Sequence, residues 1–200
     1  MTDTDLGTAL PLPRPSSELR ERLATRRSGP AQSLIAPGPS PEQIDDILSL
    51  GARTPDHGKL FPWRFVVLGP KSRADIAERL LPMAARQTPA DKARSVLAKL
   101  VNPPLSILVI STPIRDHKVP VWEQELSAGA VCMNLEHAAG ALGFAGSWIT
   151  DWYSYDAEAV ALFGVGPGER IAGFIHIGSL AEAPLERPRP VLADKVTRLP

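Results

Sequence analysis

Residues 121–142, with the sequence VWEQELSAGAVCMNLEHAAGAL, limit the possible folds more than any other part of this chain. Their apolar side chains recur at helical spacing, which predicts the longest helix of the protein. One stripe of this helix consists of Trp122, Leu126, Ala130, Met133 and His137. A second stripe has smaller side chains, namely Ser127, Val131, Asn134, Ala138 and Ala141. A helix that is weakly polar on most sides is buried, so we expect it at the centre of the domain or against a second subunit.

Shorter segments predict the other elements. Strands are expected at residues 63–69, 104–112, 144–149 and 170–180. The segment PLSILVIST at 104–112 is apolar almost throughout, so we expect that strand to be buried on both faces. Further helices are expected at 18–27 with Ser17 as its cap, at 88–101 with Thr88 as its cap, at 157–164, and from Pro70 with a buried face of Ile76, Ala77, Leu80 and Leu81.

Two elements have clear starting signals. The run SPEQ at residues 40–43 combines a capping serine, a proline at the first helical position and a glutamine three residues after the cap, which predicts a helix that stops before Pro55. Farther on, Pro62 favours an extended entry into the strand that follows. We expect the core side of that strand to carry Trp63, Phe65 and Val67.

Length and composition favour one globular domain. The chain has 200 residues, of which 44% are hydrophobic, which is enough for one domain with a sizeable core and not clearly enough for two domains. Residues 1–16 lack periodicity and predict a flexible tail, so the domain is expected at 17–200. The proline-rich segment 181–200 predicts an extended arm that packs on a partner subunit.

Charge and cysteine content indicate the compartment in which the protein is expected and the classes of partner that it is not expected to bind. The 22 basic residues balance 22 acidic ones, so we expect neither nucleic acid nor an anionic membrane as a partner. No apolar run has the length of a membrane span, and the N-terminal residues do not resemble a signal peptide. With Cys132 as the single cysteine, no internal disulfide can form, and we expect a cytoplasmic protein.

Several common chemistries have no support in the sequence. The G-x-G-x-G of residues 164–168 follows a helix and precedes a strand, the wrong order for a dinucleotide-binding loop, so it predicts a turn. No histidine pairs with another ligand at metal-binding spacing, and we expect no metal site. Cys132 lies among apolar neighbours and is expected to be inert. Glu123 and Glu125 are two residues apart on a helix and are expected to face solvent.

Basic residues gather at three turns of this otherwise neutral chain. The first cluster is Arg26-Arg27-Ser28, which either stabilises a helix C-terminus or grips a phosphate through forked guanidinium donors and a hydroxyl. The other two clusters are Arg53 with His57 and Lys59, and Arg187 with Arg189. Together the three clusters suggest one phosphorylated ligand.

Five ordered segments resemble the FMN-dependent nitroreductase family, in particular its short bacterial NAD(P)H nitroreductase branch. The segments, in chain order, are RRS (26–28), TPDHGKLFPWRF (54–65), HKVPVWEQELSAG (117–129), GFAGSW (143–148) and GFIHIGS (173–179). The resemblance extends from about Leu19 to Leu180. It implies an α+β fold with a central antiparallel sheet flanked by helices, in an intertwined homodimer with FMN at the interface.

The resemblance also implies FMN-binding residues. Arg26, Arg27 and Ser28 would hold the phosphate and ribityl chain. Arg53 and His57 would reach the FMN of the other subunit. Trp148, Ile149 and Thr150 would line the flavin, although many members have a polar or basic residue where this chain has Ile149. Arg187 and Arg189 align loosely with a basic pair that meets the phosphate in larger members of the family, and of the two Arg189 is favoured for this contact.

The implied reaction passes hydride from NAD(P)H through flavin N5 to a nitroaromatic, quinone or similar electron-poor acceptor, with ping-pong kinetics. No side chain is then needed as the catalytic acid or base, and His57 is expected to bind rather than to donate a proton. Two alternatives stay open. One is a different FMN-dependent reaction, as in an oxidase, dehalogenase or enoyl-type reductase. The other is a flavin-binding dimer without turnover.

Overall fold

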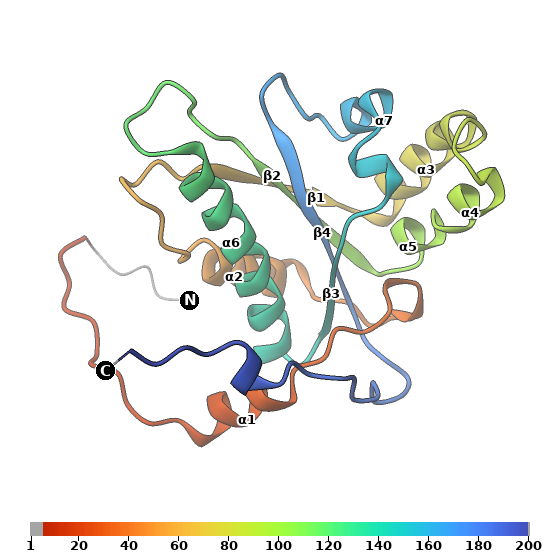
Figure 1. Cartoon of the computed structure of the whole chain (residues 1–200). Coiled ribbons are helices and arrows are strands. Elements are labelled where there is room, and N and C mark those ends of the chain that lie inside the picture. Colours follow the sequence, from red (N-terminus) through yellow and green to blue (C-terminus); the bar gives the residue numbers. More distant parts are fainter. Residues whose placement is uncertain (1–5, 200) are drawn as a thin grey trace.

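An antiparallel sheet forms the centre of the computed structural model, which describes residues 6–199 (Figure 1). In the described residues the sheet has four strands, which are β1 (Trp63–Leu68), β2 (Leu105–Ser111), β3 (Ala145–Ile149) and β4 (Arg170–Gly178). Their order is β1-β2-β4-β3, and every neighbouring pair is antiparallel. The predicted α+β class with a central antiparallel sheet is confirmed.

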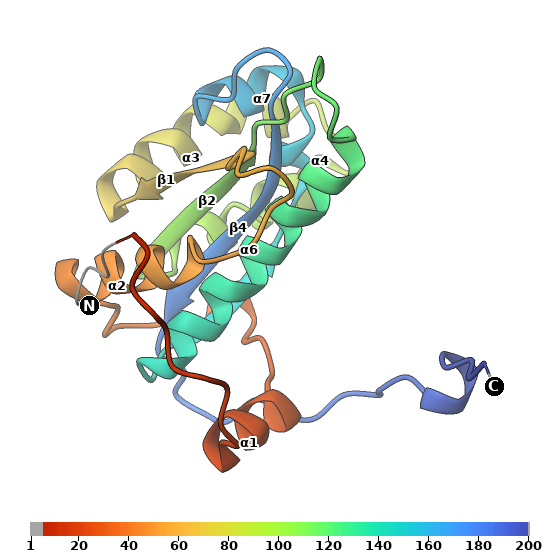
Figure 2. The same ribbon diagram turned by 90° about the vertical axis from the view of Figure 1, so that its left-hand side faces the viewer.

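Helices cover both faces of this sheet (Figures 1 and 2). The α-helices are α1 (Ser17–Thr25), α2 (Pro41–Gly51), α3 (Pro70–Ala84), α4 (Ala90–Ser95), α5 (Ala98–Val101), α6 (Val121–Ala141) and α7 (Ala157–Leu162). Short 3₁₀ turns occur at Ala31–Ser33, Trp152–Ser154 and Leu192–Asp194. The layers are therefore helix, sheet and helix.

Two apolar cores form because successive side chains of β2 point to opposite faces of the sheet. Leu108 and Ile110 join a core with α3, α5 and α7, whereas Ile107 and Val109 join a core with α2 and α6. All residues of β2 are buried, which confirms the prediction for this strand. The predicted capping box of α2 is also present, with Ser40 and Gln43 bonding each other's backbone N–H groups.

The long helix α6 is confirmed, but its two stripes have different environments. In the small-residue stripe, Val131 is fully buried and Ala138 almost so, and both pack in the core between this helix and the sheet, whereas Ala141 at the end of the stripe is exposed. On the other stripe, Trp122 is 67% exposed and Leu126 is 53% exposed. The sheet therefore accounts for only one side of this helix.

Several sequence predictions were wrong in detail. The cap of α1 is Ser16 rather than Ser17, since the Ser16 hydroxyl accepts from the N–H of Leu19. The predicted helix 88–101 divides into α4 and α5, with Pro89 rather than Thr88 at the N-cap of α4. The division follows a switch to tighter hydrogen bonding, in which the N–H of Leu97 donates to the carbonyl of Arg94.

Two residues predicted to be buried are exposed instead. Leu81 is 47% exposed because the buried stripe of α3 is centred on Ile76, Leu80 and Ala84, and Leu81 lies at its margin. Val67 is 44% exposed because it lies near the end of the edge strand β1, on the face opposite the buried Leu68. Trp63 and Phe65 do pack against the core, as predicted.

The two ends of the chain have little regular structure. Residues 6–15 are exposed and form no helix or strand, while residues 1–5 of the predicted tail lie outside the described residues. Residues 181–199 are exposed as well, and Figure 2 shows this arm leaving the body of the domain beyond α1. No helix within residues 6–199 is long and apolar enough to cross a membrane.

Candidate functional site

The segment Arg26-Arg27-Ser28 directly follows α1 and lies beside the start of β3. The backbone leaves the helical conformation at Arg26, and the N–H of Gly29 then donates to the carbonyl of Gly146 at 3.2 Å. This hydrogen bond joins the segment to an edge strand that is more than a hundred residues away in sequence. The helix end therefore presents its basic residues next to the strand predicted to line the flavin.

A buried carboxylate, Glu136 of α6, connects these two regions. Nη1 of Arg26 lies 3.3 Å from its Oε2, and the Ser28 hydroxyl donates to its Oε1 at 3.1 Å. The backbone N–H of Trp148 donates to the same Oε1 at 3.0 Å. The side chain of Glu136 is only 5% exposed. Glu136 thus binds two residues of the basic segment and one of β3.

Sequence reasoning did not select Glu136. The available signal was a carboxylate within a helix expected to be buried, since a buried charge needs a partner. The identity of that partner depends on folding, because Arg26 lies 110 residues earlier in the chain.

The C-terminal arm passes the same segment. Nη2 of Arg189 donates to the carbonyl of Arg26 at 3.1 Å, and Nε of Arg27 donates to the carbonyl of Leu185 at 2.9 Å. Arg189 also pairs with Glu186. The structure thus brings Arg189 to the basic segment, whereas the hydrogen bond of Arg187 is a local one from its backbone N–H to Glu186.

A cavity of about 720 Å³ opens beside the basic segment. Its lining contains the cations Arg22, Arg26 and Arg27, the carboxylates Glu18, Glu21 and Glu182, and apolar groups such as Phe144, Ala145 and Leu180. Nε of Arg22 is buried and has no hydrogen-bond partner among the described residues. Positive groups that lack full pairing at the wall of a cavity suit an anionic ligand.

The predicted flavin-lining residues lie along β3, at the edge of the sheet. The Trp148 indole is partly exposed and donates from Nε1 to the carbonyl of Ala172 at 3.1 Å. The ring lies so close to Gly173 that a Cβ there would come within 2.0 Å of Nε1, so only glycine fits. Ile149 is half-buried, and the Thr150 hydroxyl bonds the Tyr155 hydroxyl at 2.8 Å.

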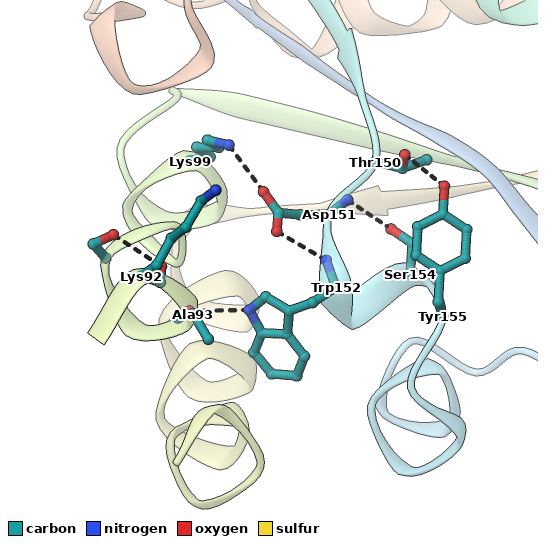
Figure 3. A network of polar contacts seen from close by, with 9 residues as sticks. Lys92, Ala93, Lys99, Thr150, Asp151, Trp152, Ser154 and Tyr155 are labelled. Atoms are coloured by element: carbon teal, nitrogen blue, oxygen red, sulfur yellow. Dashed lines mark hydrogen bonds and ion pairs between the residues drawn. The ribbon is translucent and has the colours of Figure 1, made fainter. Parts of the chain in front are cut away.

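A second cavity of about 430 Å³ lies at the end of β3. Figure 3 shows the polar network around it, in which Nζ of Lys99 pairs with Asp151 at 2.9 Å and the Trp152 indole donates to the carbonyl of Ala93 at 3.0 Å. Thr150 and Tyr155 line the same cavity. Sequence reasoning missed Lys99 and Asp151, because only the packing of α5 against the residues after β3 brings them together.

The strand β3 links the two cavities. Ala145 lines the larger cavity and Thr150 the smaller one. At about 3.3 Å per residue, these positions lie roughly 16 Å apart along the strand. An elongated ligand with a phosphate at one end could therefore follow this edge of the sheet.

Arg53 and His57 lie in a different place, on the exposed loop between α2 and β1. Nδ1 of His57 lies 2.7 Å from Oε2 of Glu123, near the N-terminus of α6. Glu123 and Glu136 are 13 residues apart on α6, so at about 1.5 Å per residue these two groups are separated by roughly 20 Å. A single chain therefore does not bring His57 to the basic segment.

The remaining candidates behave as packing or turn residues. Burial raises the pKa of the Cys132 thiol to about 12, with a smaller contribution from the charge of Glu136, and this fits the predicted inert residue. The glycine-rich residues 164–168 form the turn between α7 and β4, with left-handed backbone at Gly164 and Gly168. Within residues 6–199, no cluster of three or more His, Cys, Asp or Glu side chains is arranged to hold a metal ion.

A family model and a bacterial relative match most of this chain. The model of the "Nitroreductase family" matches residues 34–179. The chain is 35% identical over 163 residues to "Putative NAD(P)H nitroreductase YdjA" of Escherichia coli K12, which covers 80% of this chain and 86% of that protein.

Two solved structures have the same fold. The nitroreductase-like family protein from Bacillus cereus has a TM-score of 0.80 at 18% identity, covering 94% of this chain and 99% of that one. The nitroreductase from Bacteroides fragilis with bound FMN has a TM-score of 0.72 at 21% identity, covering 92% of this chain and 100% of that one. With the family model matching well over half of its length, the chain belongs to the nitroreductase family.

Proposed function

We propose that this protein binds FMN and transfers hydride from NAD(P)H to a nitroaromatic, quinone or other electron-poor acceptor, with ping-pong kinetics. Membership of the nitroreductase family supports the class of reaction. The name of the Escherichia coli relative includes NAD(P)H, and the Bacteroides fragilis structure contains FMN. The observation that carries the proposal is the gathering of Arg26, Arg27 and Arg189 beside a cavity at the start of β3.

The residues present fit a phosphate at this end of the strand. Arg26 uses Nη1 in its bonds to Ser28 and Glu136, which leaves other guanidinium N–H groups for an anion. Arg27 lines the cavity, and the unpartnered Nε of Arg22 lies nearby. We assign Arg26 and Arg27 to the phosphate, with Arg189 as an additional cation.

The other end of the site would hold the flavin ring along β3. Bound FMN would supply the hydride chemistry through its N5 atom. Trp148 would limit access to the edge of the strand, since its indole is held in place by the carbonyl of Ala172. Thr150 offers a hydroxyl, whereas Ile149 can contribute only backbone groups and apolar contact. No acid or base is assigned among the side chains.

We also propose that the protein acts as a homodimer in which Arg53 and His57 reach the partner's flavin. The exposed Trp122 and Leu126 on α6 support this arrangement, because large apolar side chains gathered on one helix face favour burial against another surface. The His57–Glu123 pair lies at the same end of that helix. Sedimentation equilibrium of the purified protein tests it, and a monomer at micromolar concentration would refute it. A cytoplasmic location is a further part of the proposal.

The decisive experiment is the visible spectrum of the purified protein before and after anaerobic addition of NADH or NADPH. Flavin absorbance that is bleached by the nucleotide supports the proposal. A colourless protein that takes up no added FMN would refute the proposal. Bound FMN that neither nucleotide reduces would instead indicate a flavin-binding dimer without turnover.

A substitution tests the phosphate assignment directly. We expect Arg26→Ala to weaken FMN binding by about 1.5–3 kcal/mol, the range for hydrogen bonds to charged groups. Arg20→Ala, which removes an exposed cation from α1, is the matched control and should leave the FMN dissociation constant unchanged. Equal effects of the two substitutions on the FMN dissociation constant would contradict a specific contact between Arg26 and the phosphate.

A separate assay tests the reaction. Turnover with nitrofurazone, menadione and oxygen as acceptors distinguishes a nitroreductase from an enzyme with another flavin chemistry.

A further inference from the structure

Glu136 takes up donors of Arg26 and Ser28, two residues of the segment expected to hold the phosphate. A serine hydroxyl has a single hydrogen, and that of Ser28 is directed to Oε1 of Glu136 at 3.1 Å. The same hydroxyl oxygen accepts from Nη1 of Arg26 at 3.3 Å, and Nη1 also lies 3.3 Å from Oε2 of Glu136. Ser28 therefore cannot donate to a phosphate while its bond to Glu136 is intact.

The carboxylate is held firmly in this position. The backbone N–H of Trp148 donates to Oε1 at 3.0 Å. Gly146 of β3 packs against the stem of the side chain, since a Cβ there would lie 3.2 Å from Cγ of Glu136. The side chain is 5% exposed, so it cannot swing into solvent without moving β3 or the basic segment. An anion is thus part of the structure beside the residues assigned to the phosphate.

We propose that Glu136 is a specificity-determining residue that stands in for the cofactor phosphate and weakens binding of the phosphorylated flavin relative to the unphosphorylated one. The proposal rests on the proposed function, because it takes FMN as the ligand of Arg26 and Arg27. A phosphate that binds Arg26 must share that guanidinium with Glu136 and lie close to a like charge, and it can take the Ser28 hydroxyl only if the bond to Glu136 breaks. Riboflavin, which lacks the phosphate, meets none of these obstacles.

The test compares two ligands in matched variants. Dissociation constants for FMN and riboflavin are measured by quenching of flavin fluorescence in the full-length protein, in Glu136→Gln and in Glu125→Gln. Glutamine keeps the shape of Glu136 and an acceptor for the N–H of Trp148 but removes the charge. Glu125 lies on the same helix as Glu136 and pairs with Arg170 of β4, so its variant controls for the loss of one negative charge elsewhere.

We expect Glu136→Gln to tighten FMN binding about tenfold or more, the equivalent of one hydrogen bond to a charged group, and to change riboflavin binding by less than about twofold. Glu125→Gln should change neither constant by more than about twofold. An equal change for both flavins in Glu136→Gln, or no change, overturns the proposal, since a purely structural role would affect both ligands alike.

A second variant allows the proposal to be tested if the first one does not fold. If Glu136→Gln does not fold, Glu136→Met removes the charge at similar volume, and the preference for FMN over riboflavin should rise in the same way. A preference that stays at the wild-type value in the folded methionine variant also overturns the proposal. A wild-type protein that binds neither flavin refutes the proposed function itself, and that outcome is visible before any variant is compared.

Discussion

Two polar clusters of this protein each contain a buried charge, and they stabilise that charge with different kinds of partner. Around Glu136, both carboxylate oxygens have partners, one of them the cation of Arg26. Around Arg73, which is 1% exposed, the guanidinium donates to the hydroxyl of Ser106 at 3.1 Å and to the carbonyl of Pro104 at 3.1 Å. Neither of these acceptors is charged.

The Arg73 cluster also contains a histidine that must stay neutral. Nδ1 of His176 lies 2.7 Å from the Ser106 hydroxyl. Burial, followed by the charge of Arg73, lowers the pKa of His176 to about 3. Nε of Arg73 and Nε2 of His176 have no partner among the described residues. The Arg73 cluster is thus stable only while the His176 ring is neutral.

The contrast suggests different roles for the two clusters. Arg26 of the Glu136 cluster lines a cavity, so this cluster is open to a ligand on one side. The Arg73 cluster lies between the sheet and α3 and is closed to ligands, so its effect should appear in stability. Four predictions, from the largest effect to the smallest, test this distinction.

The largest effect should be acid sensitivity caused by His176. Its pKa is depressed in the folded state, so below the unfolded value of about 6.5 the unfolded chain binds an extra proton and stability falls as the pH is lowered towards 3. We expect a loss on the order of 3 kcal/mol between pH 7 and pH 4. Urea unfolding at both pH values measures it.

The His176→Gln variant isolates this contribution, because other titrating groups are common to both proteins. Its free energy of unfolding should fall less between pH 7 and pH 4 than that of the wild type. Parallel pH profiles for the two proteins would show that His176 is protonated in the folded state or is not closed off from water.

A smaller effect is expected for Arg73→Ala, which should lower the free energy of unfolding by about 2 kcal/mol at pH 7. The substitution leaves a cavity and unpaired acceptors at Pro104 and Ser106, and the relief of a buried charge offsets part of this loss. Urea denaturation gives the value. Arg86→Ala, at an exposed pair with Glu158, is the matched control and should change stability by less than about 1 kcal/mol.

Glu136→Ala should be milder still, lowering the free energy of unfolding by about 1.5 kcal/mol. Its partners Arg26 and Ser28 are only half-buried and can turn to water, so the N–H of Trp148 is the main group left without an acceptor. Thermal and urea unfolding measure the change. A loss larger than that of Arg73→Ala would mean that the Glu136 cluster is the main structural one of the two.

The smallest effect is expected at Cys132, on the buried side of α6. Because burial raises the pKa of its thiol to about 12 and the residue is fully enclosed, a maleimide at pH 8 should leave the native protein unmodified. The same reagent should label it fully in 6 M urea, as mass spectrometry can show. Rapid labelling of the folded protein would indicate local opening around α6 and the Glu136 cluster.

Most of the elements could be predicted because their signals are local. The capping box at Ser40, the apolar run of β2 and the helical spacing of α6 each lie within one segment, and each predicts the observed element. The predictions that failed, such as the exposed Val67 and Leu81, concern which surface covers a residue. Local spacing does not contain that information.

The candidate site shows the same limit. Resemblance of segments indicated Arg26, Ser28 and Trp148, but neither spacing nor composition pointed to the carboxylate that joins them. Lys99 and Asp151 were missed for the same reason, since 52 residues separate them in the chain.

The sequence by itself determined the class of fold, the main elements and the family, because these depend on patterns within short segments. Only the tertiary structure decided that the basic segment lies against β3, that Glu136 takes up its donors, and that Arg73 and His176 share a closed core. The physical reason is that a buried charge or donor is defined by its partners, and in this protein those partners come from distant parts of the chain.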